Sequence, residues 1–191
     1  SFNAWTRWAD AHPSSGSFER YRSDNHLSWS LAGLLAAGTA LGDADLVAYV
    51  LDGGSWTDRR GGAYANPSSI REVIDLAIEA DGRVYEERIL RNPPIGYSFF
   101  HLWAMHLVAQ IDEVHHGRGI WAHTGSDGGN LHLAFDRYAG IFLGELTSPE
   151  PGQDGDLSGE FWQYEVVYAH WPETRFGSVI SGAAARNSWI N

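Results

Sequence analysis

The chain has 191 residues, of which 43% are hydrophobic and 13% aromatic, and its formal net charge is −11. This size and composition fit one folded domain and exclude an intrinsically disordered chain. The acidic balance and the lack of a basic run exclude a nucleic-acid-binding surface. The chain has no cysteine, which excludes disulfides and thiolate chemistry. No apolar run reaches membrane-spanning length, so we expect no membrane contact.

Apolar residues recur at the spacing of an α-helix along most of the chain. At the start of the stretch 25–41, Ser23 or Asp24 can cap the first free N–H groups, and Asp43 can cap the following helix. In chain order, helices are predicted at residues 2–11, 25–41, 43–51, between Asn66-Pro67-Ser68 and Asp81-Gly82, and at 97–114, 131–143, 160–170 and 181–189.

The segments between these helices are rich in Gly, Pro and polar residues. Residues 58–62 are predicted to form a polar connection and residues 148–159 a solvated acidic loop. Residues 83–96 are predicted to be irregular, because Pro93-Pro94 forbids a helix there. Since the alternating pattern of strands is scarce, the sequence predicts an all-α fold. Antiparallel helix pairs joined by long loops indicate part of an incomplete (α/α) toroid.

Polar side chains gather at the start of the 25–41 helix, in the run Ser23-Asp24-Asn25-His26. Asn25 and His26 fall in the first helical turn, where the positive end of the helix dipole favours an anionic ligand. Taken alone, this pattern is also that of an ordinary capped helix with an amide and an imidazole on its surface. Its meaning therefore depends on what the rest of the chain supplies.

A second polar segment, residues 86–97, carries arginines through a proline-fixed loop to Tyr97 at a predicted helix start. Asn, His, Arg and Tyr together suit β-elimination on a uronic acid. The C5 proton of a uronate is weakly acidic because the neighbouring carboxylate is negatively charged. Amide, imidazole or guanidinium donors that neutralise this carboxylate stabilise the enolate-like state. A tyrosine can take up the proton or donate one to the departing glycosidic oxygen.

The order of these motifs resembles the alginate-lyase-type polysaccharide lyases. The resemblance runs from about Arg22 to Tyr138 and depends on short motifs in a shared order. These are Asn25-His26, Asp81-Gly82, a Glu and Arg pair, Gly96-Tyr97-Ser98-Phe99, the helix Leu102–Ala109, Gly119-Ile120-Trp121 and the helix from Leu131. Such enzymes have an α/α toroid and cleave alginate or, in a related family, β-1,4-glucuronan.

The resemblance implies roles for particular residues. Asn25 and His26 take the carboxylate-neutralising and base-like positions, and Tyr97 takes that of the catalytic tyrosine. Arg88 and Arg91 both match the arginine, and we prefer Arg91 because it lies next to the proline pair and close to Tyr97. The side chains expected to bind substrate are Arg88, Trp29, His101 and Trp103. No cofactor and no metal is expected.

The sequence departs from the family pattern in the first motif. Alginate lyases often carry Asn-Asn-His-Gly-Thr-Trp, whereas residues 24–29 read Asp-Asn-His-Leu-Ser-Trp. This difference leaves glucuronan or another uronan open as the substrate.

Two other classes of function compete with the lyase. Glu86 or Glu87 could be the acid of an inverting glycoside hydrolase, with Asp24 or Asp81 as its second carboxylate. A non-catalytic sugar-binding module would explain the aromatic residues but gives the arginine loop and Tyr97 no purpose.

Three histidines at the end of a helix, His115, His116 and His123, could suggest a metal site. A histidine is favourable at that position for the helix dipole alone, so no metal ligand is assigned to them.

The helical hairpins expected ahead of Asn25 are absent from the chain. Residues 1–191 are therefore expected to be the C-terminal half of a single α/α-toroid lyase domain, with the N-terminal helices missing or on a second chain that packs against this one. The predicted partner is a uronic-acid polysaccharide, and the predicted location is secreted.

Overall fold

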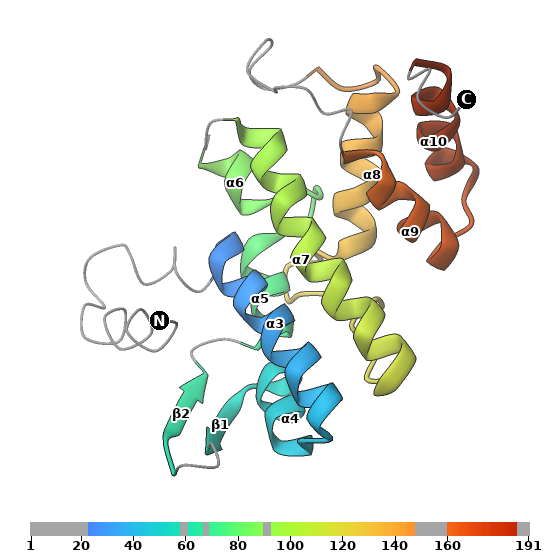
Figure 1. Ribbon diagram of the computed structural model, residues 1–191. Helices are drawn as coiled ribbons and strands as arrows, with labels where there is room; N and C mark the ends of the chain where they lie inside the picture. Colours follow the sequence, from blue (N-terminus) through green and yellow to red (C-terminus); the bar gives the residue numbers. More distant parts are fainter. Residues whose placement is uncertain (1–22, 58–60, 67–68, 90–92, 148–159, 187–191) are drawn as a thin grey trace.

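The computed structural model of the chain describes residues 23–57, 61–66, 69–89, 93–147 and 160–186 (Figure 1). These residues are mostly helical, which confirms the predicted all-α class. The described helices are α3 (Asn25–Leu41), α4 (Ala44–Asp52), α5 (Ile70–Ala77), α6 (Tyr85–Arg88), α7 (Pro94–His115), α8 (Leu131–Phe142), α9 (Trp162–His170) and α10 (Thr174–Arg186). Within the described ranges, no helix is long and apolar enough to cross a bilayer.

Helix starts follow the capping residues of the sequence. Asp24 accepts hydrogen bonds from the backbone N–H groups of His26 and Leu27, which resolves the choice between Ser23 and Asp24 as the cap of α3. Asp43 caps α4 in the same way, as predicted. Side chains just ahead of two further helices, Ser69 for α5 and Asn130 for α8, also accept a backbone hydrogen bond.

The segment predicted to be irregular, residues 83–96, contains helix at both ends. Its first part forms the single turn α6, and α7 begins at Pro94, three residues ahead of the predicted start at Tyr97. Proline forbids a helix interior but suits the first helical position, where its missing N–H would have no partner. The proline pair therefore starts α7.

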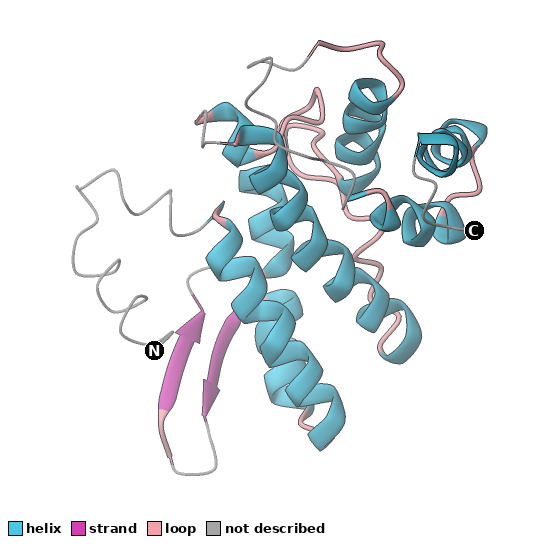
Figure 2. Ribbon diagram, turned by 45° about the horizontal axis from the view of Figure 1, so that its top comes forward, coloured by secondary structure: helices cyan, strands magenta, loops and turns pink. Residues whose placement is uncertain are grey.

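A two-stranded hairpin lies on either side of the predicted polar connection at 58–62. Strand β1 (Gly54–Thr57) pairs antiparallel with β2 (Ala63–Asn66), with Trp56 opposite Tyr64. In Figures 1 and 2 this hairpin lies beside α4, at the edge of the helical part. The strands are too short to show an alternating pattern, which is why the sequence prediction missed them.

The C-terminal part also differs from the prediction. The helix expected at 181–189 is α10, which begins at Thr174, while α9 lies inside the predicted range 160–170. The predicted helix 2–11 and acidic loop 148–159 fall outside the described residues.

Helices α3 and α7 lie side by side and run in the same direction (Figure 1). Ser28 of α3 contacts His101 of α7 near the helix starts, and Thr39 contacts His116 near the ends. The two starts therefore lie at the same end of the molecule. The closure of the helices into a toroid stays a prediction.

Aromatic rings fill the core between α7, α8 and α9. The ring of Phe99 on α7 lies 5.3 Å from that of Tyr138, 5.4 Å from that of Phe142 and 6.2 Å from that of Tyr164. The Tyr164 hydroxyl donates to the Phe135 carbonyl, which satisfies its one polar atom inside this core. These contacts hold α9 against α7 and α8.

The turn that ends at Gly82 lies so close to α8 that a side chain does not fit. Gly82 has a φ of +81°, and a Cβ there would lie 2.2 Å from the Leu133 carbonyl oxygen. We expect Gly82→Ala to lower the free energy of unfolding by about 2 kcal/mol or more, from left-handed strain and displacement of α8. Urea unfolding would measure the loss.

Gly33→Ala is the control for this substitution. Gly33 lies on the exposed face of α3, and a Cβ added there would meet nothing within 4 Å. Alanine is therefore expected to stabilise the helix by about 0.5–1 kcal/mol. Equal effects of the two substitutions would contradict the close approach at Gly82.

Candidate active site

Asp24 organises the start of α3 with both carboxylate oxygens. Oδ1 accepts from the His26 and Leu27 backbone, and Oδ2 lies 3.2 Å from His26 Nδ1. An ionised carboxylate accepts only, so His26 Nδ1 carries the hydrogen of this contact, and in the neutral ring Nε2 is then the acceptor. The His26 side chain is 73% exposed while that of Asp24 is 4% exposed. An imidazole oriented through its Nδ1 therefore projects from the helix start.

Asn25 lies inside the same turn and is buried. Its backbone N–H donates to Glu86 Oε1 at 3.1 Å. Its side-chain nitrogen Nδ2 is buried and makes no hydrogen bond to the described residues. An unpaired buried amide is costly, by about 1–3 kcal/mol, and such a group is satisfied when a ligand with an oxygen acceptor reaches it.

A chain of buried hydrogen bonds lies directly below these residues. His101 Nδ1 is 2.7 Å from Glu86 Oε2, and His101 Nε2 is 2.6 Å from Ser28 Oγ. All three side chains are fully buried. The chain joins α6, α7 and α3 at one point.

Tyr97 lies one turn ahead of His101 on α7, and Asn25 lies one turn ahead of Ser28 on α3. Residues three or four apart share a helix face, so both precede the Ser28–His101 contact on the faces that make it. At about 1.5 Å per residue, each is about 4–6 Å along its helix from that contact. Because the helices run the same way, both side chains belong to the same end of the same interface.

His101 has a different place from the one predicted. It was expected to bind substrate, but it is fully buried and both ring nitrogens already have partners in Glu86 and Ser28. We therefore assign His101 to the support beneath the site. The sequence around a histidine on an apolar helix does not indicate which side chains it will hydrogen-bond in the folded protein.

Of the two candidate arginines, Arg88 is committed elsewhere and Arg91 lies outside the described residues. Arg88 donates to Glu79 and to the Leu76 carbonyl near the end of α5, and its guanidinium lies 4.9 Å over the Tyr85 ring. These contacts direct it toward α5.

The other described guanidinium groups are also paired with carboxylates. All basic residues of the chain other than histidine are arginines. The pairs are Arg71 and Arg118 with Asp52, Arg83 with Glu79 and Asp81, Arg137 with Glu87, and Arg175 with Asp136 and Glu145. Each arginine side chain that the structure describes is thus committed to a carboxylate.

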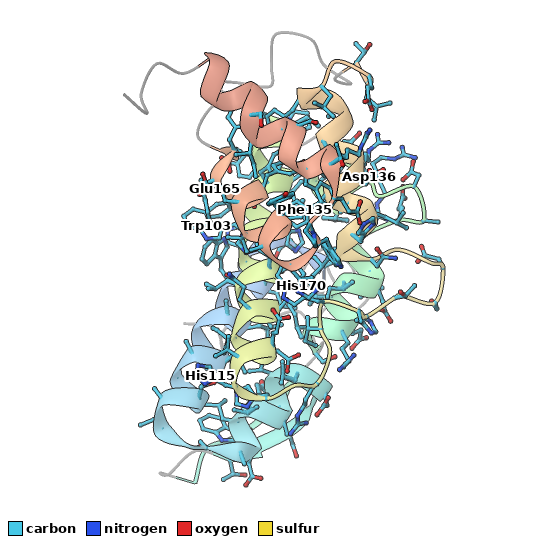
Figure 3. All side chains as sticks on the ribbon, turned by 90° about the vertical axis from the view of Figure 1, so that its right-hand side faces the viewer. Trp103, His115, Phe135, Asp136, Glu165 and His170 are labelled. Carbon is cyan, nitrogen blue, oxygen red and sulfur yellow. The ribbon has the colours of Figure 1, made fainter. Side chains whose placement is uncertain are left out.

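An aromatic strip, defined as Trp29, Phe100, Trp103 and Trp162, runs from α3 across α7 to α9. The Trp29 ring lies 5.1 Å from that of Phe100 and 5.0 Å from that of Trp103, and Trp103 lies 5.0 Å from Trp162. Phe100, Trp103 and Trp162 are each 37–42% exposed. Figure 3 shows Trp103 at the edge of the molecule, on the same side as Glu165 of α9. The strip begins one turn after His26.

The carboxylates of the hydrolase alternative are used in structural contacts. Glu87 accepts two hydrogen bonds from Arg137 and one from the Tyr138 hydroxyl. Burial raises the pKa of Tyr138 well above its ordinary value, so this hydroxyl stays a donor. Glu86 is buried between Asn25 and His101. This arrangement favours the lyase over the hydrolase.

Two of the three histidines considered as metal ligands, His116 and His123, contact different protein side chains. His116 contacts Thr39, while His123 lies between Arg71 and Asp75. Among the described residues, no group of three or more His, Asp or Glu side chains could hold a metal ion.

Sequence reasoning misses three contributions to this site. It treats the Glu86 carboxylate as a possible acid rather than an anchor, it does not single out Ser28, and it does not connect Trp162 with the tryptophans of α3 and α7. The Glu86–Asn25 and Ser28–His101 contacts join residues 61 and 73 positions apart in the chain. No local pattern encodes such a pairing.

Comparison with family models gives a match over most of the chain. The model of the family described as Alginate lyase matches residues 2–145, which include α3 to α8. Helices α9 and α10 lie beyond the matched residues. No curated protein and no solved structure matches the chain.

His106 lies beneath the aromatic strip, surrounded by the rings of Trp121, Phe135 and Trp162. Burial lowers the pKa of His106 from 6.5 to about 4. Between pH 6.5 and about pH 4, His106 therefore binds a proton more readily in the unfolded chain than in the folded chain. We expect the free energy of unfolding to fall by about 3 kcal/mol as the pH is lowered from about 6.5 to 4, and to level off below that.

Urea unfolding at a series of pH values, compared with His106→Phe, would isolate this contribution. Phenylalanine keeps a flat ring in the same surroundings and cannot titrate. A variant with the same pH dependence as the wild type would contradict the assignment.

Proposed function

This chain is a member of the alginate lyase family, and on that premise we propose that it cleaves a uronic-acid polysaccharide by β-elimination. The observation that carries the proposal is the side-by-side arrangement of the α3 and α7 starts. It supports a site in which Asn25 and Tyr97 share one end of the helix interface, with the exposed His26 in the same turn of α3 as Asn25.

In the proposed reaction, a base removes the C5 proton of the uronate. The electron pair left behind forms the C4=C5 double bond, and the C4–O glycosidic bond breaks. The departing oxygen takes up a proton and leaves as a hydroxyl, while the other product ends in an unsaturated uronate. No water is added and no electron acceptor is needed, so side chains that move protons and stabilise charge are sufficient.

The proposed roles follow the local chemistry. Asn25 Nδ2, a buried donor without an acceptor among the described residues, would bind the substrate carboxylate. His26 would present Nε2, because Asp24 holds its Nδ1. Tyr97 would exchange a proton with C5 or with the glycosidic oxygen. We assign the neutralising arginine to Arg91, since Arg88 is held by Glu79 and by the Leu76 carbonyl.

We propose that Trp29 and Trp103 bind sugar rings next to the reacting uronate. Flat aromatic faces suit the apolar faces of sugar rings, and tryptophan offers a large area at low entropic cost. The strip starts on the same side of α3 as His26 and carries no charge, so it can attract a polyanion without adding to the repulsion from a chain of net charge −11. Alginate and β-1,4-glucuronan are the candidate polymers.

Product chemistry tests the proposed function. We expect the purified protein to generate ultraviolet absorbance from the conjugated C4=C5 uronate when it is mixed with polymannuronate, polyguluronate or glucuronan. The polymer that responds identifies the substrate. Saturated reducing ends without a rise in absorbance would instead establish hydrolysis.

The role of Tyr97 is tested by Tyr97→Phe, which removes the hydroxyl and keeps the ring. General acid–base catalysis contributes about 10²–10⁴-fold to turnover, so kcat is expected to fall by that factor while oligosaccharide binding is retained. Calorimetric titration with an oligouronate would measure the binding. Turnover equal to that of the wild type would move the proton transfer to another residue.

A further inference from the structure

Glu86 belongs to a single helical turn, yet its two carboxylate oxygens bind two different helices. Oε1 accepts from the Asn25 N–H in the first turn of α3, and Oε2 contacts His101 of α7. His101 then reaches back to Ser28 of α3. The start of α3 is thus held at two points, one turn apart, by one buried network.

This network fixes the backbone of Asn25, whose side-chain nitrogen has no hydrogen-bond partner among the described residues. Asn25 Nδ2 makes no hydrogen bond to the described residues, so its own side-chain nitrogen does not anchor it. The backbone of Asn25 is anchored through Glu86, and the position of α3 against α7 is fixed through His101 and Ser28. The distance between the Asn25 amide and Tyr97 therefore depends on these three side chains.

We infer that Glu86, His101 and Ser28 are positioning residues for β-elimination. They hold the Asn25 side-chain donor at the distance from Tyr97 that the reaction requires. This inference rests on the proposed function. None of the three is assigned a substrate contact, because their buried polar atoms are already paired with Asn25, with Asp24 or with one another. They act by preorganising the donor and the acid–base group, and a displacement of about 1 Å in such a pair can cost about 10²-fold in rate.

The same helical turn supplies a matched control. Glu87 is also a buried carboxylate with several hydrogen bonds, but it points to Arg137 and Tyr138 on α8. Loss of either carboxylate leaves polar partners unsatisfied in the interior, which is destabilising. Loss of Glu86 alone alters the α3 start. A purely structural role predicts equal effects of the two substitutions on turnover, and a positioning role predicts different ones.

The test compares Glu86→Ala, Glu86→Gln, Ser28→Ala and Glu87→Ala, at a temperature where circular dichroism shows each variant folded. We expect Glu86→Ala to lower kcat by about 10²-fold with KM changed by less than about twofold. Glu86→Gln should restore most of kcat, since an amide can accept from the Asn25 N–H and donate to His101 Nδ1. Glu87→Ala should lose thermal stability and keep its kcat.

Ser28→Ala keeps the test decisive if Glu86→Ala does not fold, since it removes one hydroxyl, and a kcat about tenfold below the wild type is expected. The inference is overturned if Ser28→Ala has wild-type kcat, or if Glu86→Ala and Glu87→Ala reduce kcat equally. A wild-type protein that yields no unsaturated product from any of the three uronans would overturn the proposed function and this inference with it. An active wild type with unaffected variants would overturn the inference alone.

Discussion

The described structure depends on two adjacent buried carboxylates, Glu86 and Glu87, on the single turn α6. Neighbouring residues on a helix point in different directions, so one carboxylate reaches α3 and α7 while the other reaches Arg137 and Tyr138 of α8. Burying charge is tolerated only where hydrogen bonds and counter-charges replace water. Glu87 has the Arg137 guanidinium and the Tyr138 hydroxyl, and Glu86 has hydrogen bonds to Asn25 and His101. Together they fix three long helices relative to one short turn.

The distribution of charge explains how an acidic chain can still serve a polyanionic substrate. The arginine side chains that the structure describes form pairs with carboxylates. Several pairs lie at the protein surface, where each contributes little to stability. The α3 start carries a different kind of charge. Its first backbone N–H groups are taken up by Asp24 and Glu86, so what it offers is the Asn25 amide and the His26 imidazole, at the positive end of the helix dipole. Asp24, although acidic, is occupied by the cap and by His26.

The sequence predicts the local features well because they depend on neighbouring residues. The α3 boundaries and the Asp43 cap follow from capping chemistry and helical periodicity, and the all-α class follows from that periodicity. The predicted start of α7 is wrong because a proline can begin a helix as well as end one. The burial of His101 and the anchoring by Glu86 depend on contacts between segments that are distant in the chain. Local sequence patterns therefore cannot predict them.

The aromatic strip joins residues inside and outside the region that the family model matches. Trp29 and Trp103 belong to the part of the chain that the family model matches, and Trp162 belongs to α9, beyond it. Helix α9 is held by the Tyr164 hydroxyl and by ring contacts with Phe99 and Phe135, so Trp162 rests on a rigid support. A surface built by packed helices keeps its rings in place before a ligand arrives, which lowers the entropic cost of binding. The extension of the fold past the matched region thereby enlarges the same surface on which the proposed site opens.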